Sequence, residues 1–157
     1  RKIWFSIGGH PAFACPLNEE GNKDGYALQF DTAGPVETRI IGPDGLATDE
    51  HEEYLLENGR LPVKEALFDR DALVLEGGQA HSLGLVDPKG NTFVTVRFDA
   101  PLFGIWSPPG KNAPFICVEP WYGRCDHRDF NGTLEEREWS NSLEAGGEFN
   151  ASYSISV

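Results

Sequence analysis

The sequence predicts an all-β domain, and three features support that prediction. Glycine and proline are frequent, with 18 and 11 in the 157 residues, and they divide the chain into short segments. Apolar and polar residues alternate within many of these segments, as in strands with one buried face. Helical periodicity is weak throughout. The length suits one domain, so we assign residues 1–157 to a single domain without an internal boundary.

The alternating segments are the expected strands. In chain order they are residues 3–7, 25–30, 37–41, 72–75, 82–86, 93–98, 103–106, 115–119 and 152–157. A turn is expected at residues 87–91, because Pro88 presets φ and Gly90 readily takes a positive φ. This turn should join the two strands around it as a hairpin.

Two segments have enough helical character to be expected as helices. One covers residues 49–56, and the other begins at Thr133, where Thr133 and Glu136 form a capping-box pattern ahead of Trp139. The acidic run at residues 48–53 overlaps the first segment. We interpret that run as a solvated surface and not as a site.

The chain is acidic, with 25 Asp+Glu against 13 Lys+Arg and a formal net charge of -12. Nucleic acids and anionic membranes require a basic footprint on the protein, so we expect neither as a partner. No apolar run approaches the roughly 20 residues of a membrane-spanning helix, and the first residues do not resemble a signal peptide.

The three cysteines are predicted to be free thiols. Cys15, Cys117 and Cys125 are odd in number and lack the spacing of a disulfide framework. Free thiols persist in a reducing compartment, so we expect the protein to be cytoplasmic.

The first residues already read as the middle of a strand. Residues 2–7 alternate in character, and the chain contains no methionine and hence no initiator. We therefore expect an upstream half that is cleaved or carried on another chain. That half should cover the sheet edge that a missing first part would leave open.

Glu119 is the first candidate for a functional residue. It follows the apolar run 115–118, which is β-branched and aromatic enough to be a strand buried on both faces, and Pro120 and Gly123 are expected to end that strand soon afterwards. By alternation, Cys117 and Glu119 share one face. Desolvation raises the pKa of such a carboxyl group and makes it a better base. The alternative is a structural ion pair with a nearby arginine.

His10 is the second candidate. It lies between Gly8-Gly9 and Pro11, so a restricted backbone holds it at the exit of the first expected strand. Histidine accepts and donates protons near neutral pH. The alternative is a histidine that only bonds the backbone of a turn.

Asp71 is the third candidate, because it directly precedes the apolar run 72–75 at the mouth of an expected strand. Asp69 and Arg70 beside it are expected to pair with each other in solvent. The alternative for Asp71 is a carboxylate that caps its own turn.

No motif in the sequence indicates a metal or a bound phosphate. Cys125, Asp126 and His127 are adjacent, but neighbours on a strand face opposite sides, and no second Cys/His pair has metal-site spacing. We therefore expect no metal. The chain also lacks a Gly-rich phosphate loop, a Gly-x-Ser-x-Gly elbow and a His-Glu-x-x-His run, which argues against kinases, α/β-hydrolases and zinc proteases.

Several motifs, in this order, resemble the aldose 1-epimerase (galactose mutarotase) family, most closely its LacX-like branch. They are FSIGGHPAF at 5–13, LFDRDAL at 67–73, GIWS at 104–107, FICVEPWYG at 115–123 and the tail at 147–155. The resemblance spans essentially the whole chain. It implies the galactose mutarotase-like β-supersandwich, in which two large antiparallel sheets pack face to face beside a sugar cleft. This chain would be roughly the C-terminal half of that domain.

The resemblance also implies a chemistry. The family interconverts the α and β anomers of a sugar: a base removes the C1 hydroxyl proton while an acid protonates the ring oxygen, and no cofactor is needed. Glu119 matches the base and His10 the acid. Asp71 matches the carboxylate that holds sugar hydroxyls, with Asp69 as the alternative in a shifted alignment. Trp106 matches a residue that lines the cleft.

Two partners follow from the resemblance. One is a hexose of the glucose or galactose type. The other is the N-terminal half of the same domain, on this chain's own precursor or on a separate chain. The family's other histidine and its substrate-binding arginine lie in that half, so the chain alone is expected to be inactive.

Three alternatives stay open at this point. They are a non-catalytic carbohydrate-binding domain of the same fold, an epimerase for phosphorylated hexoses and a purely structural β-domain. Basic residues do not cluster near the motifs, which disfavours a phosphorylated substrate. An acid and a base acting across one sugar are expected about 5–8 Å apart, given a hydrogen-bond reach of about 3 Å. A structural domain would scatter His10, Asp71 and Glu119 over different faces.

Overall fold

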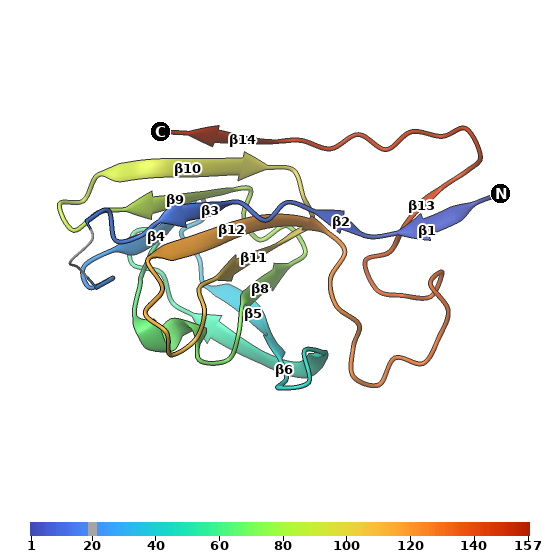
Figure 1. The fold of residues 1–157 in the computed structure, drawn as a ribbon, viewed down its shortest axis with the longest axis horizontal. Helices are drawn as coiled ribbons and strands as arrows, with labels where there is room; N and C mark the ends of the chain where they lie inside the picture. The colour runs from blue at the N-terminus through green and yellow to red at the C-terminus, as the bar shows by residue number, and fades with distance from the viewer. Residues whose placement is uncertain (19–21) are drawn as a thin grey trace.

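A computed structural model of the chain describes residues 1–18 and 22–157, and nearly all of its regular structure is β (Figure 1). The strands are β1 (Ile3–Phe5), β2 (Ile7–Gly8), β3 (Ala12–Ala14), β4 (Ala27–Phe30), β5 (Val36–Ile41), β6 (Ala47–Tyr54), β7 (Arg60–Pro62), β8 (Leu73–Glu76), β9 (Ser82–Val86), β10 (Thr92–Phe98), β11 (Leu102–Trp106), β12 (Phe115–Tyr122), β13 (Asn141–Leu143) and β14 (Tyr153–Ser156). Within the described residues, the single helical element is a 3-10 turn, η1 (Glu65–Phe68).

The strands form two large sheets and a small ribbon. The seven-stranded sheet has the order β2-β12-β11-β8-β5-β6, and β3 joins it by pairing with β12. The five-stranded sheet has the order β14-β10-β9-β4-β7, and β1 pairs with β13 in the ribbon. Neighbouring strands are antiparallel in all three sheets.

The two large sheets pack face to face around one hydrophobic core. Leu28, Leu83 and Val96 enter it from the five-stranded sheet, and all three are fully buried. Phe103 and Ile105 enter it from the seven-stranded sheet. The prediction of an antiparallel β-sandwich is therefore confirmed.

Strand β12 separates this core from the outer face of the seven-stranded sheet. Ile116 and Val118 belong to the core cluster, so the intervening Cys117 and the following Glu119 point to the opposite face. Residues 116–120 are all buried, which confirms a strand covered on both sides.

Pro120 does not end this strand, contrary to the expectation from sequence, because β12 continues to Tyr122. Proline lacks the backbone N–H that a strand normally donates to its neighbour. Pro120 lies opposite the interruption between β2 and β3, so no neighbouring strand requires that hydrogen bond. Its carbonyl still accepts a hydrogen bond from Gly9 N at 3.0 Å.

The helix expected at residues 49–56 was wrong, because this segment belongs to β6. Strand β6 pairs along β5, with Thr38 opposite Glu52 and Arg39 opposite His51. It is the edge strand of the seven-stranded sheet, and its acidic middle is exposed, which confirms the solvated surface. Charged side chains on an edge strand also discourage pairing with another sheet.

The second expected helix was also wrong. The capping interaction itself forms, since the Thr133 backbone N–H and Oγ1 both donate to Glu136 Oε2, at 2.9 and 3.0 Å. Residues 134–139 form turns, however, and Trp139 has a φ of 60°. A positive φ at this position ends any helical path.

The other expected strands are confirmed, most of them to within two residues, although 3–7 is divided at Ser6 into β1 and β2. The turn at residues 87–91 also forms. Asp87 N donates to Asn91 O at 2.9 Å, and Gly90 has a φ of 90°. Strands β3, β7 and β13 were not predicted, because each is only three residues long.

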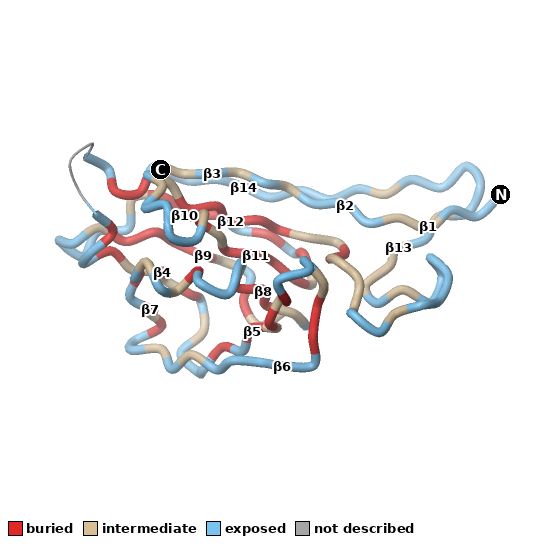
Figure 2. Tube along the Cα trace, turned by 60° about the horizontal axis from the view of Figure 1, so that its bottom comes forward, coloured by how far each residue is buried: buried red, intermediate tan, exposed pale blue. Residues whose placement is uncertain are grey.

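The terminal segments are extended and exposed (Figure 2). The β1–β13 ribbon lies beside the sandwich, and every residue of β14 is exposed at the edge of the five-stranded sheet. Ile3 and Ile155 are 52% and 48% exposed, so apolar side chains on these segments face solvent. Across residues 1–18 and 22–157, no helix has the length and hydrophobicity needed to span a bilayer.

Thr38 provides a test of how β5 and β8 are joined. Its buried Oγ1 accepts a hydrogen bond from Val74 N at 2.7 Å. Thr38→Val keeps the shape but leaves that N–H unpaired, which should lower the free energy of unfolding by about 1–3 kcal/mol. Urea denaturation measures the loss. The exposed Thr92→Val is the matched control, expected within about 0.5 kcal/mol of the parent. Equal losses in the two variants would contradict the role assigned to the Thr38 hydroxyl.

Candidate active site

A cavity of about 470 Å³ opens on the outer face of the seven-stranded sheet. Its walls come from the connection after β2, the start of β8, and the end of β12 with the residues after it. The polar and aromatic residues that line it include His10, Asp71, Glu119, Trp121 and Arg124. Three of the four residues predicted from the sequence thus share one cavity, in contrast to the scatter expected of a structural domain.

Glu119 projects into this cavity from β12. It is only 4% exposed, and its cross-strand neighbour is Gly104 on β11. Burial raises the pKa of the Glu119 carboxyl group above its ordinary value of 4.5, and the negative charge of Asp71 adds to that rise. The nearby His10 and a hydrogen bond from Trp121 lower the pKa of Glu119, but by less than burial raises it. The result is a proton acceptor stronger than an ordinary glutamate.

His10 lies directly beside Glu119. Its Nε2 is 3.3 Å from Glu119 Oε1, and its side chain is 63% exposed. It sits in the interruption between β2 and β3, where residues 9–11 run alongside β12: Gly9 N donates to Pro120 O and Val118 N donates to Pro11 O. The predicted meeting of the two side chains therefore occurs in the structure.

The separation of the pair differs from the expectation. A gap of about 5–8 Å was expected from hydrogen-bond reach, but the nitrogen and the oxygen are in contact at 3.3 Å. No sugar ring fits between two atoms at that distance. The physical reason is electrostatic, because a buried carboxylate lowers its free energy by drawing a nearby imidazole onto itself.

Trp121 lines the cavity and was not among the predicted site residues. A Cβ added to Gly8 would lie 2.7 Å from the indole, and one added to Gly104 would lie 2.6 Å from it. These two glycines thus form a slot that holds the ring next to Glu119. The signal in the sequence was the alternation itself, since Trp121 shares a face with Glu119.

Asp71 lies at the cavity wall and also caps its own turn, whereas sugar binding by this residue stays a prediction. It lines the cavity, and its Oδ1 also accepts a hydrogen bond from Ala72 N at 2.7 Å within its own turn. Its φ of 73° lies in the left-handed region, which aspartate tolerates better than most residues. Asp69 instead lines a neighbouring cavity, and Arg70 pairs with Glu50 and not with Asp69. The placement favours Asp71 over Asp69.

Trp106 is not among the residues that line this cavity. Its ring packs edge-on against His10, with the centroids 6.2 Å apart. The side chain therefore contacts the imidazole, and the tryptophan that faces the cavity is Trp121. Direct contact between Trp106 and a sugar stays a prediction.

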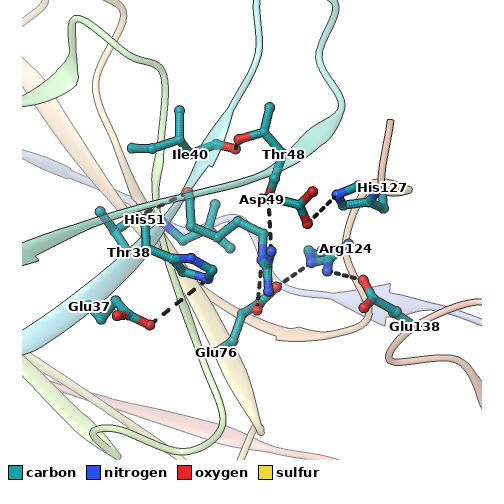
Figure 3. Close-up of polar contacts among 12 residues, drawn as sticks. Glu37, Thr38, Ile40, Thr48, Asp49, His51, Glu76, Arg124, His127 and Glu138 are labelled. Atoms are coloured by element: carbon teal, nitrogen blue, oxygen red, sulfur yellow. Dashed lines mark hydrogen bonds and ion pairs between the residues drawn. The ribbon is translucent and has the colours of Figure 1, made fainter. Parts of the chain in front are cut away.

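Arg124 is a further residue that the sequence reasoning missed. Its side chain is 1% exposed, lines the cavity and forms ion pairs with Glu76 and Glu138 (Figure 3). Glu76 also pairs with Arg39 at 2.9 Å, and Arg39 in turn donates to Thr48 O. This network joins β5, β6 and β8 to the segment after β12.

Two other arginines lie close to the site but are already paired. Arg70 and Arg128 line the neighbouring cavity, which shares Asp71 with the first one. Arg70 pairs with Glu50, and Arg128 pairs with Asp44 at 3.1 Å. Their charges are thus compensated, so the placement of basic residues still disfavours a phosphorylated substrate.

Among residues 1–18 and 22–157, two groups of side chains have the composition of metal ligands. Within each group the potential ligand atoms lie within 4.8 Å of one another. One group is His10 and Glu119 of the cavity wall together with the buried Cys117, and the other is Asp49, His127 and Asp129 on the surface. The adjacent Cys125-Asp126-His127 run contributes only His127 to either group.

The chain is similar to known proteins over nearly its whole length, although it matches no family model. Protein LacX of Lactococcus lactis subsp. lactis, in its plasmid and chromosomal forms, is 32% identical over 136 residues, which are 85% of this chain and 45% of LacX. The crystal structure of a galactose mutarotase related enzyme from Lactobacillus acidophilus matches with a TM-score of 0.83 and 31% identity, over 98% of this chain and 52% of that one.

A galactose mutarotase-like protein from Lactobacillus casei ATCC 334 gives a TM-score of 0.80 at 28% identity, over 99% of this chain and 52% of that chain. The chain thus spans about half the length of the relatives it matches. The resemblance to galactose mutarotase-related proteins, LacX among them, is therefore confirmed in both sequence and fold.

Proposed function

We propose that the protein that contains this chain is an aldose 1-epimerase, which interconverts the α and β anomers of a hexose. The observation that carries the proposal is the contact between His10 Nε2 and the buried Glu119 Oε1, 3.3 Å apart in a cavity large enough for a sugar. Similarity to galactose mutarotase-related proteins supports it.

The proposed reaction opens the sugar ring and closes it again. Glu119 takes the proton of the C1 hydroxyl while His10 gives a proton to the ring oxygen, and the C1–O5 bond breaks. Rotation about C1–C2 and closure with the reverse proton transfers deliver the other anomer. The hydroxyl oxygen and the ring oxygen are both bonded to C1. An acid and a base that lie close together can therefore exchange protons with these two oxygens.

Substrate binding must separate the ion pair of the free protein. Glu119 is held by β12, but the His10 side chain is 63% exposed and can rotate away. We propose that the sugar hydroxyl replaces the imidazole next to Glu119 and that His10 then covers the ring oxygen. Asp71 at the cavity wall holds other hydroxyl groups of the sugar.

The rest of the domain is a proposed partner. This chain spans about half of its relatives, and its β1, β2 and β14 segments expose apolar side chains such as Ile7 and Ile155. We propose that an N-terminal half, on the same precursor or on a separate chain, packs on these segments and completes the sugar site. All three cysteines are free thiols, which supports a reducing compartment such as the cytoplasm.

A carbohydrate-binding protein without catalysis is the second candidate. Asp71 and Trp121 in the cavity wall favour it, because a carboxylate and an aromatic ring can hold a sugar without exchanging protons with it. Polarimetry of freshly dissolved α-D-glucose and α-D-galactose with the complete protein separates the two candidates. Sugar binding with no acceleration of mutarotation would establish the second.

Glu119→Gln tests the proposed base. The amide keeps the size of the side chain but does not accept a proton, so mutarotation should slow by about 10²- to 10⁴-fold. The rate is measured by polarimetry on the complete protein, with circular dichroism to confirm folding. Glu53→Gln, at an exposed position of β6, is the matched control and should keep the parent rate. A near-normal rate in Glu119→Gln would remove Glu119 from the mechanism.

The pH dependence of kcat/KM tests the environment of Glu119. The base must be ionised, so activity falls as the pH drops through its raised pKa, and the acid limb should lie above pH 4.5. Trp121 lowers that pKa by hydrogen bonding, so Trp121→Phe should move the limb to higher pH. Profiles are recorded in buffer with a chelator. A limb at or below pH 4.5, or one that Trp121→Phe moves to lower pH, would contradict this account.

Asp71→Asn tests the proposed sugar-binding carboxylate. Asparagine tolerates the left-handed backbone but loses the charge, so KM should rise by about tenfold, the equivalent of one weakened charged hydrogen bond. Initial polarimetric rates at increasing sugar concentration give KM. Asp69→Asn, in the neighbouring cavity, is the control and should leave KM unchanged. The reverse result would assign the role to Asp69.

A further inference from the structure

Three side chains with metal-binding atoms converge in the proposed active site. His10, Cys117 and Glu119 each offer one ligand atom, and these atoms lie within 4.8 Å of one another. We propose that this group binds Zn²⁺, or another thiophilic divalent cation, and that the bound ion excludes the sugar. Ion binding does not depend on the proposed function; only the inhibition rests on it.

Strand geometry brings the three ligands together. Cys117 and Glu119 are two residues apart on β12, so both side chains leave the outer face of the sheet. His10 reaches them from the interruption between β2 and β3. Strand β3 anchors that interruption, because Ala12 pairs directly with Cys117. The positions of the ligands are thus set mainly by the backbone of paired strands.

The spacing of the ligand atoms fits a tetrahedral ion. Bonds of about 2.0–2.3 Å to Zn²⁺ place neighbouring ligand atoms about 3.3–3.7 Å apart. His10 Nε2 and Glu119 Oε1 already lie 3.3 Å apart, and Cys117 Sγ is within 4.8 Å of both ligand atoms. Binding would require the exposed imidazole to rotate toward the ion and the Cys117 and Glu119 side chains to close to the same spacing.

The burial and chemistry of the group select the kind of ion. Cys117 is 1% exposed and Glu119 is 4% exposed, whereas His10 faces the cavity. A thiolate and an imidazole favour Zn²⁺ over Mg²⁺ or Ca²⁺. One thiolate and one carboxylate also balance the two charges of the ion, which lowers the cost of burying it.

Binding exchanges a proton for the metal without any oxidation. Burial and the Glu119 charge raise the pKa of Cys117 to about 11, so the free thiol is protonated at neutral pH. The S–H bond is replaced by an S–Zn bond, and the proton passes to solvent. The fourth position on the ion faces the cavity and takes a water molecule.

The ion and the sugar then compete for the same two side chains. A Glu119 carboxylate bound to Zn²⁺ is a weaker base toward the C1 hydroxyl, because its negative charge is shared with the ion. His10 bound through Nε2 does not donate to the ring oxygen. The metal should therefore inhibit mutarotation competitively with the hexose.

The surface group of Asp49, His127 and Asp129 carries no such proposal. His127 Nε2 already bonds Asp49 at 3.1 Å, and its Nδ1 accepts from Asp129 N at 3.2 Å. Both carboxylates are exposed to water.

Cd²⁺ is the probe for the cavity site, because a cadmium–thiolate bond gives an ultraviolet charge-transfer band that reports sulfur ligation directly. Titration of the complete protein with Cd²⁺ should produce this band with one equivalent. Cys117→Ser should abolish the band and weaken binding by at least tenfold, since loss of even an outer partner costs about 10- to 100-fold. Cys125→Ser, at the other thiol beside the cavity, is the matched control and should keep the band.

Competition with Zn²⁺ and with sugar completes the test. Zn²⁺ should displace Cd²⁺, and His10→Gln should also weaken binding, which keeps the test decisive if Cys117→Ser fails to fold. Absence of the band, or a band that survives Cys117→Ser and disappears in Cys125→Ser, would overturn the site. A Cys117-dependent band in a protein without mutarotase activity would support the site and overturn the proposed function. Metal that binds through Cys117 but leaves mutarotation unaffected would overturn the inhibition.

Discussion

The alternation of side chains along β12 is the constraint on which both the core and the candidate site depend. Ile116 and Val118 pack between the two sheets, so Cys117 and Glu119 must leave the other face of the same strand. A shift of one residue in register would turn the carboxylate into the core and the apolar pair toward the cavity face of the sheet. The hydrophobic effect that holds the sandwich together therefore also fixes the direction of Glu119.

The site is assembled from places where regular pairing is interrupted. The gap between β2 and β3 carries His10 over β12, and Pro120 opposite that gap has no unpaired N–H to satisfy. Gly8 and Gly104 lack side chains where the Trp121 indole lies against the sheet. The gap thus makes room for His10, and the two glycines make room for Trp121, while β11 and β12 remain paired.

The sequence was sufficient to predict most strands, because alternation and turn residues are local signals. The grouping of His10, Asp71 and Glu119 in one cavity was predicted by the resemblance to the aldose 1-epimerase family and not by local signals. The sequence was not sufficient for β6, where an edge strand exposed over most of its length lacks an apolar period. The sequence also did not predict the contact distance between His10 and Glu119. That distance depends on the attraction between two side chains that the fold brings together from distant parts of the chain. Arg124 had no local signal, because its carboxylate partners are distant along the chain or in an irregular loop.

Two carboxylates on the outer face of the seven-stranded sheet show why Glu119 is suited to proton transfer. Glu76, on β8, contacts two guanidinium groups, those of Arg39 and Arg124, which stay charged at any pH at which the protein folds. Arg124 lies just after β12, but it already forms ion pairs with Glu76 and Glu138. Glu119 has no guanidinium partner among the described residues, and its contact is the exposed imidazole of His10. A buried carboxylate paired with a titratable group keeps a raised pKa, and this difference is the physical argument against a structural ion pair at Glu119.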